Sequence, residues 1–224
     1  MPTSVKPAPA EHAQLMDRIY RYTRHVYDAT RKFYLLGRDK LIEEMDIQPG
    51  DHVVEIGCGT ARNLIKLHRK APEAALYGLD ASDEMLKTAG ENLQRAGLGN
   101  QVKLSQGLAE DLDPKSLFGL EQPFDVAFFS YALSMIPSWQ EALDAALATL
   151  KPNGKLYIVD FGDHAELPGW FQKMQERWLA LFHVQYRPEL IAYLESLQEQ
   201  GKVSLTLTPI AKRYALIATL TKRA

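Results

Sequence analysis

The sequence predicts an α/β protein with a seven-stranded, mostly parallel sheet, helices on both faces and a helical cap from its N-terminal part. Continuous apolar strands alternate with helical segments between residues 52 and 162, which is typical of a parallel sheet covered on both sides. A turn with two glycines joins the first strand to the next helix. The last two strands are separated by too few residues for a crossover helix, so we expect them to pair antiparallel.

The elements follow from the period of the apolar residues and from the turn residues between them. A helix over 11–36 ends before Gly37, a residue type common at helix ends, and a second helix covers 38–46. Strands are expected at 52–57, 74–80, 101–107, 124–132, 154–162, 202–209 and 212–222. Helices are expected at 61–70, 82–96, 114–120, 139–150, 167–182 and 187–201. Residues 1–46 therefore form a leader and cap on the substrate side, and 47–224 form one α/β domain with a helical insertion at 164–187.

The composition is that of an ordinary globular protein, with 224 residues of which 46% are hydrophobic and 24% charged. The net charge of −2 argues against a general nucleic-acid binder, so no nucleic-acid partner is expected. Cys58 is the single cysteine, which excludes an internal disulfide and fits a reducing compartment. The sequence has neither an apolar segment typical of a signal peptide nor the roughly 18 to 20 apolar residues of a membrane span. A cytoplasmic location is expected.

The segment VVEIGCGTA, residues 53–61, carries the strongest functional signal. Gly57 and Gly59 allow a tight turn and let a ligand approach where a Cβ would collide. Asp80 stands 21 residues after Gly59, at the end of the second strand, and this spacing suits a carboxylate that binds two ribose hydroxyls. The alternative is that Asp80 is the N-cap of the next helix, although Ser82 can serve as that cap.

The same segment also indicates which nucleoside cofactor the turn could bind. A dinucleotide fingerprint requires a glycine where Arg62 stands, so a nicotinamide-dependent dehydrogenase is disfavoured. Glu55 would repel a pyrophosphate but attract the ammonium of an amino-acid group. The residues favour a ligand with a ribose and a cationic amine but no phosphate, and S-adenosylmethionine meets this description. A non-catalytic nucleotide-binding or scaffold protein stays a further alternative, because fold alone does not fix function.

Five segments resemble the successive motifs of class I S-adenosylmethionine-dependent methyltransferases: VVEIGCGTA, LDASDEML, QGLAEDL, FDVAFFSYALSMIPSW and LKPNGKLYIVDFGD. The resemblance covers residues 51–163 and implies the Rossmann-like fold of that class, with S-adenosyl-L-methionine as cofactor and S-adenosyl-L-homocysteine as product. Ala61 departs from the pattern, since many members have a third glycine there. The cofactor-binding residues it implies are Arg38, Glu55, Gly57, Cys58, Gly59, Thr60, Asn63, Asp80, Ala81, Ser82, Met85, Ala109, Glu110 and Ser130.

Within this set, the resemblance places the glycine segment at the methionine end of the cofactor, Asp80 at the ribose, and Ala109 with Glu110 at the adenine. Ser130 and Tyr131 are expected below the methyl donor, and Arg38 is the candidate for the cofactor carboxylate. Cys58 is expected to be a packing residue, because nothing near it in the sequence would make it a thiolate. No histidine spacing is typical of a metal site, so no metal is expected.

The segments YRYTRHVYDATRKFYLLGRDKLI, SYALSMIPSW and WLALFHV resemble the N-methyltransferase of bacterial betaine-lipid synthesis. That family converts diacylglyceryl-homoserine to its N,N,N-trimethyl form. The resemblance implies a lipid acceptor with an amino-acid headgroup and peripheral contact with the anionic inner face of the membrane. Phosphatidylethanolamine or a small soluble amine is the alternative acceptor. The apolar face of the insertion, around Trp170 and Trp178, is either core or a membrane contact.

Tyrosine and arginine alternate along one face of the first predicted helix. Guanidinium groups bind carboxylates bidentately, and aromatic faces attract a quaternary ammonium, so this face suits a zwitterionic headgroup. The plain alternative is a surface helix whose long side chains cover apolar surface. Tyr27 is also a candidate contact of the sulfonium, and Tyr27 and Tyr131 are the candidate catalytic residues. The candidate acceptor-binding residues are Tyr20, Arg24, Arg31, Tyr34, His183 and Arg187.

Overall fold

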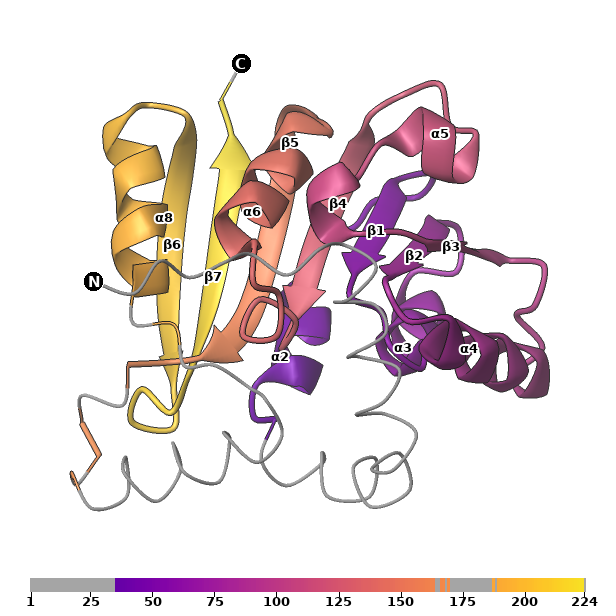
Figure 1. Cartoon of the computed structure of the whole chain (residues 1–224), viewed down its shortest axis with the longest axis horizontal. Helices are drawn as coiled ribbons and strands as arrows, with labels where there is room; N and C mark the ends of the chain where they lie inside the picture. The colour runs from indigo at the N-terminus through magenta and orange to yellow at the C-terminus, as the bar shows by residue number, and fades with distance from the viewer. Residues whose placement is uncertain (1–34, 164–165, 168, 170–186, 188, 224) are drawn as a thin grey trace, which may run out of the picture.

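A single seven-stranded sheet with the strand order β3-β2-β1-β4-β5-β7-β6 organises the computed structural model (Figure 1). The structure describes residues 35–163, 166–167, 169, 187 and 189–223. Neighbouring strands are parallel from β3 to β5, whereas β7 is antiparallel to both β5 and β6, as predicted. The strands are β1 (His52–Ile56), β2 (Ala75–Asp80), β3 (Val102–Gln106), β4 (Phe124–Ser130), β5 (Leu150–Phe161), β6 (Val203–Ile210) and β7 (Ala215–Lys222).

Helices cover both faces of the sheet, because successive strand residues point to opposite sides and both sides are apolar. Buried residues of α2, α3 and α4 pack on one face, and those of α5, α6 and α8 pack on the other. The helices are α2 (Arg38–Glu44), α3 (Arg62–Lys70), α4 (Asp83–Arg95), α5 (Pro114–Phe118), α6 (Trp139–Ala148) and α8 (Glu189–Glu199), with a 3-10 turn η1 at Ala109–Asp111. None of the helices in the described part of the chain is long and apolar enough to cross a membrane.

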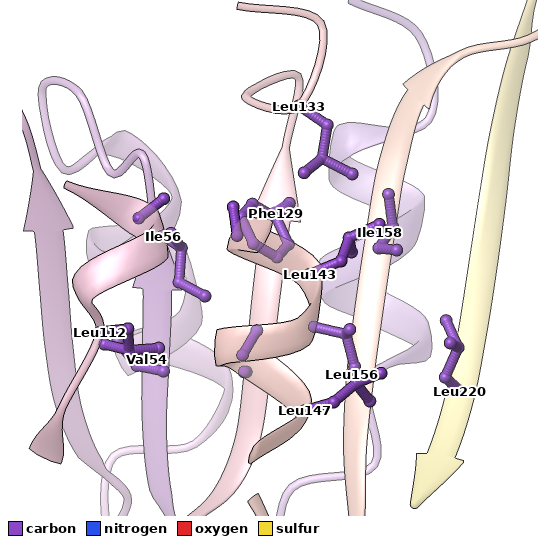
Figure 2. Close-up of a cluster of buried hydrophobic side chains, with 14 of the residues drawn as sticks. Val54, Ile56, Leu112, Phe129, Leu133, Leu143, Leu147, Leu156, Ile158 and Leu220 are labelled. Atoms are coloured by element: carbon purple, nitrogen blue, oxygen red, sulfur yellow. The ribbon is translucent and has the colours of Figure 1, made fainter. Parts of the chain in front are cut away.

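The core beneath α6 shows how alternate residues of one strand pack on opposite faces of the sheet (Figure 2). Phe129 of β4 and Ile158 of β5 point to this face and meet Leu143 of α6, and the side chains of Phe129 and Leu143 are completely buried. The preceding residue of β4, Phe128, is equally buried on the opposite face. The central strands are therefore apolar on both sides, which is why they were recognisable in the sequence as continuous apolar runs.

The largest boundary differences are at β5 and β7. β5 begins at Leu150 instead of the predicted 154, because Leu150 pairs with Phe124 before a register shift in β4. β7 begins at Ala215 instead of 212, because residues 211–213 form a turn with φ values of 47°, 56° and 60°. The predicted helices at 11–36 and 167–182 lie outside the described residues, apart from single positions such as Leu35 and Leu36, which are not helical. The proposed division at residue 46 stays a prediction.

The turn between β6 and β7 closes against Gly162, which directly follows β5. The Gly162 amide donates to the Tyr214 carbonyl oxygen at 2.9 Å. A Cβ on Gly162 would collide with the carbonyl oxygen of Arg213, a backbone atom that cannot swing away. The Arg213 guanidinium also binds both carboxylate oxygens of Asp163, with Nε donating to Oδ1 at 2.6 Å. This turn is therefore held close to the carboxyl end of β5.

We predict that Gly162→Ala destabilises the protein by about 1–3 kcal/mol, because the added methyl overpacks a rigid backbone contact. Urea unfolding measures the change. The matched control is Gly90→Ala in α4, where a Cβ would meet nothing within 4 Å. This control should gain roughly 0.5–1 kcal/mol from the better helix propensity of alanine. Equal effects of the two substitutions would contradict the packing at Gly162.

Candidate active site

The glycine turn lies where the carboxyl ends of β1, β2 and β4 meet. The amides of Gly57 and Cys58 donate to the Leu79 carbonyl oxygen at 2.8 and 3.0 Å, so the turn folds onto the end of β2. Gly57 has φ 75°, and a Cβ there would lie 2.6 Å from the Cβ of Ala132 in the loop after β4. Gly59 also has positive φ, 52°. The two glycines are needed for a tight turn against that loop, as predicted.

Glu55 is buried at the end of β1, with only 1% of the residue exposed. Its Oε1 accepts a hydrogen bond from Asn63 Nδ2 at 2.7 Å. Its Oε2 is buried and has no hydrogen-bond partner among the described residues. Burial raises the pKa of Glu55 to about 8, while the Asn63 hydrogen bond and the charge of Arg38 act in the opposite direction. A ligand with a positive charge beside this oxygen would favour the ionised form of the carboxyl and would satisfy the oxygen.

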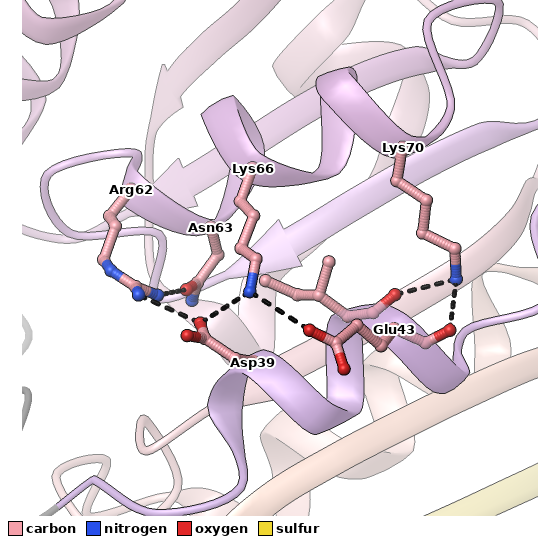
Figure 3. A network of polar contacts seen from close by, with 7 residues as sticks. Asp39, Glu43, Arg62, Asn63, Lys66 and Lys70 are labelled. Carbon is pink, nitrogen blue, oxygen red and sulfur yellow. Dashed lines mark hydrogen bonds and ion pairs between the residues drawn. The ribbon is translucent and has the colours of Figure 1, made fainter.

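Asn63, which donates to Glu55, is also part of a chain of polar contacts between α2 and α3 (Figure 3). Asn63 Oδ1 accepts from Arg62 Nη1 at 3.2 Å, and Arg62 Nη2 donates to Asp39 at 2.9 Å. Exposed pairs of this kind contribute little stability. Lys70 is better placed to stabilise the fold, because its ammonium donates hydrogen bonds to carbonyl oxygens at the end of α2. It donates to the carbonyl oxygens of Ile42, Glu43 and Met45 at 2.8, 2.7 and 2.5 Å.

Asp80 holds two backbone turns together at the end of β2. Its Oδ2 accepts from the Gly59 amide at 2.7 Å, and its Oδ1 accepts from the Ser82 amide at 2.9 Å. The N-cap of α4 is Ser82, whose hydroxyl accepts from the Met85 amide at 3.3 Å, so the alternative that Asp80 is the cap is wrong. A carboxylate oxygen can accept more than one hydrogen bond, so ribose binding by Asp80 stays compatible with this geometry and stays a prediction.

Tyr131 links the loop after β4 to the segment before α2. Its hydroxyl donates to the Leu36 carbonyl oxygen at 2.6 Å, and its ring packs edge-on against Phe161 with centroids 4.9 Å apart. Burial raises the pKa of Tyr131 well above its usual value, so the hydroxyl is neutral at physiological pH. Next to it, the Oγ of Ser130 is buried without a partner among the described residues. The catalytic role of Tyr131 stays a prediction.

Cys58 and Ala61 complete the glycine turn. The Cys58 side chain is buried and burial raises the pKa of its thiol, so it fits the expected packing role. Ala61 is the N-cap of α3 and has φ 61°, a left-handed conformation that glycine adopts more readily. The local geometry explains why a third glycine is common at this position and why its replacement by the smallest chiral residue is tolerated.

The remaining predicted cofactor residues lie along the same edge of the sheet. Glu110, in η1 after β3, accepts from the Ser138 hydroxyl at 2.6 Å. The Ala81 carbonyl oxygen accepts from Gln106 at 3.2 Å, which ties the ends of β2 and β3 together. Arg38 opens α2, and its charge lowers the pKa values of Glu55 and Tyr131, so it lies near both. Ala109 and Met85 are buried, and the Thr60 carbonyl oxygen accepts from Asn92 at 3.0 Å.

The candidate residues Tyr20, Arg24, Tyr27, Arg31, Tyr34 and His183 lie outside the described residues. Arg187 is described: its Nη2 donates to the Ile136 carbonyl oxygen at 2.9 Å. Within the described ranges, no group of three or more histidine, cysteine or acidic residues could hold a metal.

Sequence reasoning missed Asp160, a buried carboxyl near the end of β5 that is 3% exposed. It accepts from the amides of Ser134 and Phe161 at 3.1 and 2.8 Å, and burial raises its pKa to about 6. The signal for it was the single acidic residue inside the apolar run LYIVDF.

Comparison with known proteins identifies the family. Residues 47–204 match the model of the methyltransferase domain family. The chain belongs to this family. A demethylmenaquinone methyltransferase from Listeria welshimeri is 30% identical over 142 residues, which are 63% of this chain and 57% of the relative. The chain thus spans less than two thirds of the length of this curated relative.

Solved structures share the fold of this methyltransferase-family chain at low sequence identity. An O-methyltransferase family protein from Burkholderia thailandensis has a TM-score of 0.71 at 16% identity, covering 95% of this chain and 64% of that protein. The [4+2]-cyclase SpnF has a TM-score of 0.73 at 15% identity, covering 95% and 96%. These likenesses show the fold alone.

Family membership implies S-adenosylmethionine as the cofactor, and the residues of the site fit it. The unsatisfied Glu55 Oε2 suits the ammonium of its amino-acid part. Asp80 lies at the end of β2, where ribose binding by its carboxylate stays a prediction. No pyrophosphate-binding third glycine is present, since Ala61 and Arg62 follow the turn.

We predict that Glu55 makes the ligand-free protein less stable as the pH rises. The folded protein retains a proton up to about pH 8 that the unfolded chain loses near 4.5, so stability falls across this window. Glu55→Gln should remove this slope and raise the melting temperature at pH 8 by several degrees, since roughly 2–4 °C accompany each kcal/mol. Thermal unfolding over a pH series checks this. The exposed Glu91→Gln should keep the wild-type slope.

We predict that Asp80→Asn weakens binding of S-adenosylhomocysteine roughly 10- to 100-fold, because hydrogen bonds to a charged group are the stronger ones. Isothermal calorimetry measures the affinity. The control is Asp83→Asn, an exposed carboxylate at the start of α4. Unchanged affinity in a folded Asp80→Asn protein would exclude the ribose assignment.

Proposed function

We propose that this protein transfers methyl groups from S-adenosylmethionine to the amine of a lipid headgroup, with diacylglyceryl-homoserine as the acceptor and its N,N,N-trimethyl form as the product. The observation that carries methyl transfer is the buried Glu55 carboxyl, with one oxygen unsatisfied beside the glycine turn. The acceptor is supported by the alternating tyrosines and arginines of residues 20–38 and by the resemblance of that segment to the betaine-lipid enzymes.

The bound cofactor supplies a methyl group attached to a positively charged sulfur. The chain's own contribution is to hold and orient both partners and to exclude water. In the proposal, Glu55 binds the amino group of the cofactor and Arg38 its carboxylate, while Asp80 binds the ribose. These assignments give one carboxylate to the amino group, one to the ribose and a guanidinium to the cofactor carboxylate, and the neutral Tyr131 adds no charge to the site.

The acceptor amine must arrive without its extra proton. A neighbouring guanidinium lowers the pKa of an amine by repulsion between like charges, which favours the neutral form. The oxygen of Tyr131 can accept a hydrogen bond from the amine, since its own proton is directed to Leu36. In the proposal Tyr20, Tyr27 and Tyr34 surround the nitrogen with aromatic faces, which attract it once it is quaternary.

A lipid acceptor also requires the protein to meet the membrane surface. The proposal includes peripheral contact with anionic lipids at the inner face, through the cationic part of residues 18–40. Residues 1–46 then serve as a cap on the acceptor side of the α/β domain.

Methylation of demethylmenaquinone is the second candidate function. It is favoured by the curated relatives, of which the Listeria welshimeri protein is 30% identical over 142 residues. The two candidates differ in the acceptor, which is the amine of a lipid headgroup in the first and demethylmenaquinone in the second. Phosphatidylethanolamine and small amines are the remaining alternatives for the amine acceptor.

We predict that the purified full chain, supplied with labelled S-adenosylmethionine, adds up to three methyl groups to diacylglyceryl-homoserine in vesicles. The same vesicles carrying phosphatidylethanolamine or demethylmenaquinone should gain none. Lipid mass spectrometry identifies the product, and Glu55→Gln serves as the control with impaired cofactor binding. Methylation of demethylmenaquinone alone would establish the second candidate and exclude the first.

A further inference from the structure

The two oxygens of the Glu55 carboxyl have different surroundings. Oε1 accepts a hydrogen bond from Asn63 Nδ2 at 2.7 Å, whereas Oε2 is buried and has no partner among the described residues. Glu55 is 1% exposed and Asn63 is 7% exposed, so water does not compete for the bond between them. One side-chain amide of α3 therefore occupies one oxygen of this carboxyl and leaves the other one to a ligand.

Arg62 sets the orientation of the Asn63 amide. A side-chain amide can turn either its oxygen or its nitrogen toward a neighbour, and only the nitrogen can donate to a carboxylate. Arg62 Nη1 donates to Asn63 Oδ1 at 3.2 Å, as Figure 3 shows. A guanidinium has donors and no acceptor, so it can bind only the amide oxygen. Nδ2 is thereby directed to Glu55, and Arg62 itself is held by Asp39, to which Nη2 donates at 2.9 Å.

This orientation of the amide favours a negative charge on Glu55. Burial raises the pKa of Glu55 to about 8, and the hydrogen bond from Asn63 acts in the opposite direction. An amide turned the other way would present its oxygen, which can bind only the protonated carboxyl. Asn63 thus brings the ionised form of this buried carboxyl closer to neutral pH.

The charged groups around Glu55 come from several elements. Arg38 of α2 and Arg62 of α3 lower the pKa of Glu55, and Asp80 of β2 raises it. The thiol of Cys58 in the glycine turn is neutral, because burial raises its pKa well above the usual value. Among the described side chains, Asn63 is the one that donates a hydrogen bond to Glu55 directly.

We propose that Asn63 is a positioning residue for the cofactor, because it holds Glu55 by Oε1 and keeps Oε2, with its negative charge, for the amino group of S-adenosylmethionine. Arg62 supports this role by fixing the amide. The proposal rests on the function proposed above in one respect, the contact of Glu55 with the cofactor amino group, and it does not depend on the acceptor. Glu55 is protonated at neutral pH in the ligand-free protein, so binding of the ammonium releases this proton to the solvent.

Carbon-13 NMR of the Glu55 carboxyl in the ligand-free full chain is the first test, with Glu55→Gln to assign the signal. The wild-type carboxyl should titrate near pH 8. Asn63→Leu keeps the volume of the side chain and favours the helix but removes the Nδ2 donor. Its titration should move upward by roughly one pH unit, because a hydrogen bond to a charged group changes the equilibrium about tenfold or more.

Arg62→Met tests the orientation of the amide while Asn63 stays in place. The freed amide can turn its oxygen to Glu55, so the titration of Glu55 should again move upward. Lys66→Met is the matched control on the same helix. The Lys66 ammonium lies 3.1 Å from the same Asp39 carboxylate and 3.5 Å from Glu43, so this variant removes a positive charge but not the Asn63 contact. Its Glu55 should titrate as in the wild type.

Calorimetry with S-adenosylhomocysteine, which carries the same amino-acid part, is the second test. Asn63→Leu should bind roughly 10-fold more weakly than the wild type at about pH 7, but only about two-fold more weakly at about pH 9, where Glu55 is largely ionised in the wild type and half ionised in the variant. The matched control is Asn92→Leu on α4. Asn92 donates to the Thr60 carbonyl oxygen at 3.0 Å and accepts from Arg95 at 3.0 Å. Any loss in this control should be the same factor at every pH.

A loss in Asn63→Leu that is equal at every pH would assign it a purely structural role and overturn the proposal, as would an unchanged titration of Glu55. Both measurements are made without an acceptor, so these results refute the role of Asn63 alone. Absence of lipid methylation by the wild type refutes the proposed acceptor instead. Absence of S-adenosylhomocysteine binding to the wild type refutes the cofactor contact of Glu55 on which both proposals rest.

Discussion

Burial of the Glu55 carboxyl is the constraint on which the site depends. An ionised carboxylate is costly to bury without partners, and only one of its oxygens is hydrogen-bonded within the described chain. The polar chain through Asn63 and Arg62 to Asp39 keeps this carboxyl in place and connects α2 to α3. In the ligand-free protein Glu55 therefore keeps its proton at neutral pH, and a positive charge beside it, such as the amino group of S-adenosylmethionine, would favour the ionised carboxylate.

The fold could be predicted from the sequence because the central strands are buried on both faces. Segments such as FDVAFFS are apolar without alternation, and helices of clear amphipathic pattern separate them. The predicted strand boundaries were less accurate where the backbone conformation, and not the pattern of apolar residues, decided where a strand begins. Residues 211–213 have left-handed backbone conformations and shorten β7, while the register shift near Phe124 lengthens β5. Neither feature depends on a residue type that could be recognised in the sequence. Asn153 and Arg213 show that non-glycine residues also adopt positive φ in such turns.

The cofactor residues were predictable because their roles follow from local spacing. A strand, a glycine turn and an acidic residue at the next strand end are all read within 30 residues of one another. Asp160, Ser134 and Arg187 were harder to associate, because they come from three separate segments that only the sheet order brings together. Lys70 was missed for a different reason: its partners are carbonyl oxygens, which every residue possesses and no sequence pattern marks.

The strand order has a consequence for biosynthesis. β7 lies between β5 and β6 although it follows both in the sequence. While the ribosome is still making residues 215–222, the nascent chain can pair β5 with β4 but leaves the other edge of β5 open to unwanted partners. The turn against Gly162 can form only after this strand emerges, so the β5-β7-β6 edge of the sheet is assembled late in translation.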